Sequence, residues 1–421
     1  MSFQDIRKSR KWLSAEEIRL LVLLLFIFVL LLIGNIMLAR ILPGGEWFFL
    51  RWSGARAFLF EKIELYSTEI AQRTQAVVYG RAAFSSEYTY VLNDPFFIVL
   101  LYTPLALFRD FTLARGIWML LSESAMVGTT LLAFNLSEWE PPRWLYISLI
   151  GFSLFSFFSL NALVTGTPTI VLLFLYGCIL IALRSRSDEL AGALLALVAY
   201  QWEVSGLFFL FILVFVFANR RWNVLAGFGM SLFVFFVVSF LTNSGWGLPY
   251  IRAVLSDWYR GTNLSFGHLL STWFPNARFS IGGIVSIILG IILFIEWLGS
   301  VNSHFRRVVW TASLSLAVTP LIGFAIFPSN HVVLILPFVL ICALVWERWK
   351  RRRVLVSILI LIFVLLIPFG LYFRSVDVYD PLANDLISIL PPIAAIVGLY
   401  WMRWWVLHSP RTWFDRVGDY R

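Results

Sequence analysis

The stretch "IRLLVLLLFIFVLLLIGNIMLARIL", residues Ile18 to Leu42, decides the fold class. It is an apolar run with one arginine near each end. A helix of about 20 apolar residues is long enough to cross the hydrocarbon core of a bilayer. The run is too long for a signal peptide, and no small-residue cleavage site follows it. We therefore expect a membrane-spanning helix at the start of this chain.

The composition extends this expectation to the whole chain. Of the 421 residues, 60% are hydrophobic and only 14% are charged, whereas a soluble domain has about 25% charged residues. Further apolar runs of similar length follow the first, which predicts an all-α, multi-pass membrane protein. The two cysteines, Cys178 and Cys342, each lie in an apolar run, so we expect no disulfide framework.

The apolar runs predict a single integral membrane domain over residues 1–421, with about twelve spans. The expected spans are 17–39, 112–134, 144–161, 168–184, 189–202, 204–218, 223–242, 279–297, 306–326, 331–346, 354–373 and 386–402. The two spans around 189–218 could instead form one long helix. The run 96–108 is too short to span and predicts a juxtamembrane or re-entrant helix.

The positions of the basic residues predict the topology. Short basic loops favour the cytoplasmic side, and they include "RSRS" (residues 184–187), "NRR" (219–221), "HFRR" (304–307) and "ERWKRRR" (347–353). We therefore expect both termini, residues 1–17 and 403–421, in the cytoplasm of a cell whose plasma membrane holds the protein. The net charge of +9 then needs no nucleic-acid partner.

The same topology puts the longest polar segments on the outer face. They are residues 40–111, 243–278, 327–330 and 374–385. The first should carry juxtamembrane helices. The inner loops are too short for a catalytic domain, so we expect the active site on the outer face. No internal repeat is visible, although many transporters have one.

The first outer segment opens with "GGEWFFLRWSGARAFLF", residues 44–60. A carboxylate at the membrane boundary loses hydration, which raises its pKa and suits a general base, so Glu46 is a candidate. The alternative is a solvated loop acid, and this alternative also applies to Asp94. The stretch Phe49 to Phe60 could lie along the headgroup plane, with Arg51 and Arg56 available to phosphates or acting only as snorkelling anchors.

Two further candidates, Glu203 and His331, stand at the expected outer ends of spans, and a third, His268, lies in the second outer segment. Glu203, in "YQWEVSG", lies between two apolar runs, and an ionisable group at membrane depth is a functional-site hypothesis. It could also be an acid that only reaches a water-filled crevice. His331 and His268 could donate to a phosphate or exchange a proton, or they could be neighbours of helix caps.

Several chemistries have no support in the sequence. There is no zinc-type spacing of histidine, cysteine and acidic residues, no glycine-rich phosphate loop after a strand, no GxSxG motif and no aspartate-rich cluster. We therefore expect no metal and no cofactor.

Several motifs, taken in order, resemble the multi-spanning glycosyltransferases of the GT-C fold, specifically family 87, whose members use polyprenol-phosphate-mannose. The motifs are "GGEWFFLRWSGARAF" (residues 44–58), "NDPFFIVLLYTPLALFRDFTLARGIWMLLSES" (93–124), Gly166-Thr167, "EVSG" (203–206), Asn263 with Ser265, and "FPSNHVVLILP" (327–337). Glu46 stands where the family tends to have aspartate, and Glu203 stands where a lysine is usual.

The resemblance implies inverting transfer of a sugar, mannose or another hexose, from a polyprenol-phosphate carrier to a lipid or glycan acceptor. It implies Glu46 as the general base and His331 as a phosphate-binding group or proton relay. The implied donor-site residues are Arg260, Asn263, Ser265, Arg51 and Arg56, and the possible substrate contacts are Glu203, Thr167 and His268. Such a reaction needs one base and not a pair of carboxylates.

Two alternatives stay open at this stage. The protein could be a transporter or flippase of lipid-linked glycans that uses Glu203 without chemistry. Since both glutamates depart from the family pattern, it could also be an inactive member that serves as a scaffold for envelope assembly.

Overall fold

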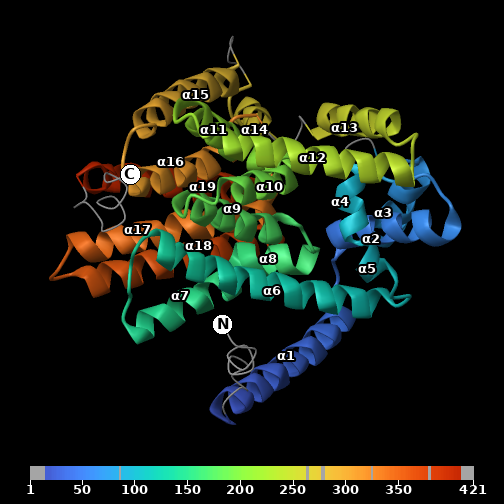
Figure 1. The fold of residues 1–421 in the computed structure, drawn as a ribbon, viewed down its shortest axis with the longest axis horizontal. Helices are drawn as coiled ribbons and strands as arrows, with labels where there is room; N and C mark the ends of the chain where they lie inside the picture. Colours follow the sequence, from blue (N-terminus) through green and yellow to red (C-terminus); the bar gives the residue numbers. More distant parts are fainter. Residues whose placement is uncertain are drawn as a thin grey trace, which may run out of the picture.

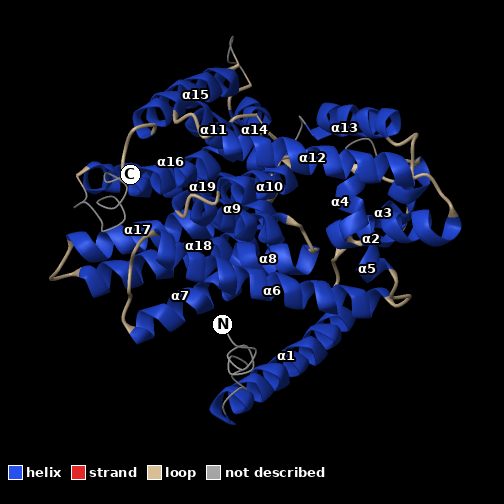
Figure 2. Cartoon of the chain, viewed as in Figure 1, coloured by secondary structure: helices blue, strands red, loops and turns tan. Residues whose placement is uncertain are grey.

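The computed structural model describes residues 15–84, 87–261, 265–275, 280–323, 326–377 and 381–408. Figure 1 shows these residues as one bundle of helices, and Figure 2 shows no strand among them. The predicted all-α class is therefore confirmed for the described residues.

Seven described helices are long and apolar enough to cross a membrane. They are α1 (Ala15–Ile41), α6 (Phe111–Leu136), α12 (Trp222–Thr242), α15 (Ile281–Ser300), η5 with α17 (Pro328–Leu334 and Ile335–Arg348), α18 (Arg353–Asp377) and α19 (Pro381–Leu407). Helices α7 (Arg143–Phe155) and α8 (Phe157–Thr165) meet at a bend of 44° and could together form an eighth.

The expected count of twelve spans is not confirmed, because four of the expected spans correspond to shorter helices. These are α9 (Thr169–Arg184), α10 (Asp188–Val198), α11 (Trp202–Ala218) and α16 (Phe305–Val318), with 16, 11, 17 and 14 residues. Hydropathy locates apolar sequence, but turns such as Ala199–Gln201 decide where each helix ends. The structure also shows two helices around 189–218 and not one.

Apolar residues lie both at the centre of the bundle and on its outside. Helix α17 is central and packs against α6, α16, α18 and α19, whereas α1 and α18 leave most of their apolar side chains exposed. Figure 1 shows α1 (dark blue) diverging from the bundle after its contact with α6. A helix surface of this kind is stable in lipid and not in water, which supports a membrane-embedded protein.

The segment 40–111 folds into short helices. They are α2 (Glu46–Arg56), η2 (Ala57–Glu61), α3 (Thr68–Tyr79), α4 (Phe96–Leu101) and α5 (Thr103–Ala106). The predicted position of Phe49–Phe60 along the headgroup plane does not match the structure, because α3, α4 and α5 cover α2 and bury residues 50–55. Helix α2 thus belongs to a small core with Phe96 and Trp118.

Helices α10 and α12 pack closely against each other. A Cβ atom on Gly192 would lie 2.0 Å from the Val224 carbonyl oxygen, and one on Gly227 would lie 2.3 Å from the Glu189 carbonyl oxygen. Small residues at a helix crossing permit this backbone contact. These contacts therefore fix the first turns of α10 against α12.

We predict that Gly192→Ala lowers the free energy of unfolding by about 3 kcal/mol, because backbone atoms must move apart. Thermal unfolding in detergent measures the loss. Gly229→Ala on the same pair of helices is the control, since a Cβ there would meet nothing within 4 Å. Equal unfolding midpoints for the two variants would contradict this packing.

Candidate functional site

A cavity of about 500 Å³ opens at one end of the bundle. Its described lining consists of Trp47, Arg51, Tyr88, Asn93, Asp94, Thr167, Pro168, Tyr200, Gln201, Trp202, Glu203, Tyr250, Val254, Asp257, Trp258, Gly323, Phe327 and Asn330. The volume is within the usual range for ligand sites.

Five separate segments of the chain build this cavity. They are α2 with the extended stretch 88–94, the turn between α8 and α9, the turn between α10 and α11, helix α13 (Gly247–Gly261), and residues 323–330 before and within η5. Each of them is a helix end, a connection or a short helix. The segments that the basic-loop pattern assigned to one side of the membrane thus meet at one cavity.

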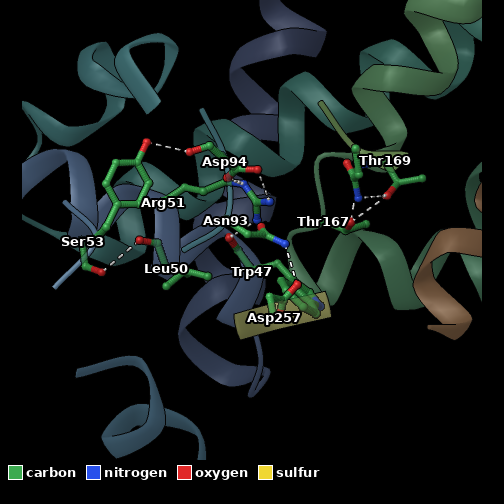
Figure 3. A network of polar contacts seen from close by, with 11 residues as sticks. Trp47, Leu50, Arg51, Ser53, Asn93, Asp94, Thr167, Thr169 and Asp257 are labelled. Carbon is green, nitrogen blue, oxygen red and sulfur yellow. Dashed lines mark hydrogen bonds and ion pairs between the residues drawn. The ribbon is translucent and has the colours of Figure 1, made fainter. Parts of the chain in front are cut away.

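A buried ion pair forms one wall (Figure 3). The Nε atom of Arg51 lies 2.6 Å from Oδ2 of Asp94, and Nη2 donates to Oδ1 at 3.1 Å. Nη1 of Arg51 donates to the Trp47 carbonyl oxygen at 2.9 Å. Only 3% of Arg51 and 1% of Asp94 is exposed. The neighbouring carboxylate raises the already high pKa of Arg51 further, against the effect of burial. Arg51 therefore stays charged, and its contacts with Asp94 fix α2 against residues 88–94.

Asp257 on α13 closes the same wall from the other side. Its Oδ1 accepts from the Tyr88 hydroxyl at 2.6 Å, and its Oδ2 accepts from Nδ2 of Asn93 at 2.7 Å. Figure 3 shows the contact between Asn93 and Asp257 beside the Arg51–Asp94 pair. Burial and the Asp257 charge raise the pKa of Tyr88 well above its usual value. Tyr88 is therefore a permanent donor to Asp257.

Aromatic rings form part of the cavity lining. Trp47 contacts Tyr88 at 5.4 Å and Phe327 edge-on at 5.2 Å between ring centroids. Trp202 and Trp258 add two further indole rings to the lining. Flat apolar rings next to carboxylates match the two faces of a sugar, which has C–H groups on one side and hydroxyls at its edge.

Glu203 supplies a carboxylate to the lining from the first turn of α11. The described residues of the cavity wall hold three carboxylates, on Asp94, Glu203 and Asp257, and one guanidinium, on Arg51. Asp94 and Asp257 already accept hydrogen bonds from protein groups. Among the described residues, no donor to Glu203 is found. Burial, followed by the charge of Asp257, raises the pKa of Glu203 to about 8, so its carboxyl group can form hydrogen bonds with a ligand.

Glu46 lies at the edge of this site and does not belong to its lining, which begins at the next residue, Trp47. Gly44 and Gly45 precede it with φ values of 109° and 87°. A Cβ on Gly45 would lie 2.8 Å from Nε of Arg115. The two glycines therefore let the chain turn tightly over Arg115, which donates to the Leu42 carbonyl oxygen at 2.9 Å and to that of Val164 at 2.9 Å.

The surroundings of Glu46 act on its pKa in both directions. Burial raises the pKa, while its own backbone hydrogen bond and the Arg115 charge lower it, and the net direction is upward. The sequence predicted this direction from the membrane boundary, and here burial of the carboxylate within the protein accounts for it.

His331 is buried next to the cavity and does not line it. Its Nε2 atom is 2.7 Å from the Ser388 carbonyl oxygen on α19, and its ring meets Phe158 edge-on at 5.3 Å. Asn330, the preceding residue, is the one that lines the cavity. The structure gives no hydrogen bond between His331 and Glu46 among the residues it describes.

The other predicted residues have varied positions. Thr167 lines the cavity and its hydroxyl pairs with that of Thr169 at 2.9 Å, as Figure 3 shows. Arg56 donates to the Ala106 carbonyl oxygen at 3.2 Å, outside the lining. Ser265 caps α14 (Phe266–Trp273) by accepting from the His268 amide.

The last three predicted residues do not add to the described wall of the cavity. His268 is exposed on α14 and does not line the cavity. Asn263 and the side chain of Arg260 lie outside the described residues.

Sequence reasoning missed most of the lining. Asp94 was grouped with the solvated loop acids, and Asp257, Tyr88 and Asn93 were not singled out. The "NDP" triplet at residues 93–95 was a usable signal, because proline fixes the end of an extended stretch just where two polar side chains precede it.

The comparison with protein families shows which family the chain belongs to. The model of glycosyltransferase family 87 matches residues 90–368, about two thirds of the chain, and this range includes Asp94, Thr167, Glu203 and Asp257. The chain belongs to glycosyltransferase family 87. The match begins after Glu46, so it covers most of the cavity but not the proposed base. No curated protein and no solved structure matches this family 87 chain.

We predict that Asp94→Asn lowers the free energy of unfolding of this family 87 protein by about 3 kcal/mol, because it leaves the buried Arg51 charge without its partner. Chemical unfolding in detergent measures the loss. Glu87→Gln is the control, since the Arg81–Glu87 pair is exposed and such pairs contribute little.

The double variant Arg51→Met with Asp94→Leu should regain some of the stability lost in Asp94→Asn, because it removes both charges together. An Asp94→Asn protein as stable as the parent would show that the pair does not fix this wall.

Proposed function

We propose that this membrane glycosyltransferase moves a sugar, mannose or another hexose, from a polyprenol-phosphate carrier to a lipid or glycan acceptor at the outer face of the plasma membrane. The observation that supports it most is the cavity, which combines aromatic rings, a carboxylate without a protein donor among the described residues and one guanidinium in a family 87 chain. The predicted topology puts this cavity on the outer side, with both termini in the cytoplasm.

The proposed reaction is a single displacement. The acceptor hydroxyl oxygen attacks the anomeric carbon, the bond from that carbon to the phosphate oxygen breaks, and polyprenol phosphate leaves. The hydroxyl proton passes to a carboxylate on the protein. The configuration at the anomeric carbon inverts, and one base is enough.

Two carboxylates compete for the role of base. The family motif implies Glu46 as the base, and its raised pKa brings the carboxylate closer to the working range of a general base. Glu203 has the better position, because it lines the cavity and no described residue donates to it. We assign the base to Glu46 and the binding of sugar hydroxyls to Glu203, and the experiment below separates the two roles.

The departing phosphate needs positive partners. Arg51 has five N–H groups. Nη2 donates to Asp94 and Nη1 donates to Trp47, and Nε lies against Asp94 in the ion pair, so one N–H group on each of Nη1 and Nη2 has no protein partner among the described residues. We propose that these two N–H groups bind donor oxygens, together with Arg260 and Asn263 near the end of α13. We propose that His331 stabilises the fold of this region or relays a proton. A proton relay would require its ring to break the contact with the Ser388 carbonyl oxygen.

We expect Glu46→Gln to reduce sugar transfer at least about 100-fold, because a general base typically contributes that much. The assay is transfer of labelled mannose from polyprenol-phosphate-mannose to lipid, by membranes that contain equal amounts of each variant. Glu64→Gln is the control, since Glu64 is exposed in the same segment. Full activity of the Glu46→Gln protein would contradict this assignment and would indicate Glu203 as the base.

The pH dependence of transfer separates the two glutamates. A base must be ionised, so transfer should fall with decreasing pH through the pKa of Glu46, which lies above the usual value of about 4.3 for glutamate. In Glu203→Gln the same decline should persist with weaker substrate binding. Loss of this decline in Glu203→Gln, and not in Glu46→Gln, would contradict the assignment.

A further inference from the structure

Helix α13 has two faces of opposite character. Its inner face carries Tyr250, Val254 and Asp257 at helical spacing into the cavity. Its outer face carries large apolar side chains that are between 52% and 84% exposed. These are Leu248, Ile251, Leu255 and Tyr259. A monomer in water would not expose so many apolar groups on one short helix.

Few contacts hold α13 in place. No described helix packs closely along it, and Figure 1 shows it lying apart from the core, beside α12. Tyr250 meets Tyr66 and Trp246 at 5.8 Å and 5.6 Å between ring centroids. Asp257 joins α13 to the cavity wall by accepting hydrogen bonds from Tyr88 and Asn93.

The neighbourhood of α13 indicates what covers its outer face. Four residues separate the end of α12 from the start of α13. α12 is apolar and exposed near this end, where Phe240 and Leu241 are 54% and 83% exposed. Trp246 joins the two helices by contacting Phe236 at 5.7 Å and Tyr250. An amphipathic helix that continues the surface of a membrane-spanning helix is suited to lie in the headgroup region, with its apolar side chains in lipid.

We propose that α13 is a lid that rests on the bilayer and closes the cavity, with the contacts of Tyr88 and Asn93 to Asp257 as its latch. Release of the latch lets α13 move with the lipid surface and opens the cavity towards the bilayer. A lipid-borne substrate would enter by this side, and this last step rests on the proposed function. The bilayer contact and the latch do not depend on the proposed function.

The bilayer contact is tested by a fluorophore on Leu255→Cys in the full-length protein, with Cys178→Ala and Cys342→Ala removing the native thiols. In phosphatidylcholine nanodiscs, the probe should be quenched by brominated lipid and not by aqueous iodide. The same probe on Gln72→Cys, exposed on α3, should show the reverse. Quenching of the Leu255→Cys probe by iodide, or by neither agent as in a protein contact, would overturn the bilayer assignment.

The latch is tested by hydrogen exchange of the amides of α13. Tyr88→Phe keeps the ring and removes the donor to Asp257, so exchange over residues 247–261 should become about tenfold faster. Tyr90→Phe is the control, because Tyr90 packs in the same ring cluster and no hydrogen bond joins it to Asp257 in the described residues. Equal exchange of α13 in the two variants would overturn the latch. Neither readout needs sugar transfer, so a failed transfer assay leaves both tests intact.

Discussion

The cavity depends on the buried ion pair between Arg51 and Asp94. The pair joins α2 to the extended stretch 88–94, and these two segments carry Trp47, Tyr88 and Asn93. A buried ion pair gains little net stability, because removing two charges from water offsets their attraction. Its effect is on specificity, since only one arrangement of the two segments pairs both charges. The positions of Trp47 and Tyr88 in the cavity lining follow from that arrangement.

A second arginine, Arg115, fixes the chain just before α2. It donates to carbonyl groups at the end of α1 and to Val164 in α8. Carbonyl groups at a helix end have no partner in their own helix, so the guanidinium satisfies them and joins two helices. Gly45 is needed because any side chain there would collide with Arg115. The "GGE" triplet is thus explained by packing around Arg115, and the position of Glu46 follows from it.

The sequence predicted the all-α class and the family, and the segments that form the cavity were among those it assigned to one side of the membrane. It could not predict the wall itself. Asp94 pairs with a residue 43 positions earlier, and Asp257 pairs with residues more than 160 positions earlier. A single sequence does not reveal such distant partners, so these acids cannot be distinguished in it from other acidic residues in loops. Glu203 was found because an apolar context makes an acidic residue conspicuous, and Thr167 was found through the resemblance to family 87.

The differences in helix length and position have a related cause. Apolar composition does not distinguish a helix that faces lipid from one buried among other helices, so α10 and α16 resembled spans and proved short. The same ambiguity affected α2, whose arginines and aromatic residues suggested an interfacial helix although the structure buries it. Helix α13 has the segregated faces that were expected of α2.

Sugar transfer within this cavity is the central claim. The most direct test is an experimental structure of the full-length protein in nanodiscs with a non-transferable polyprenol-phosphonate sugar. We predict the sugar between Trp47 and Glu203, with the phosphonate on the side of Arg51. A sugar bound at the opposite end of the bundle, near the basic residues 348–353, would contradict the claim.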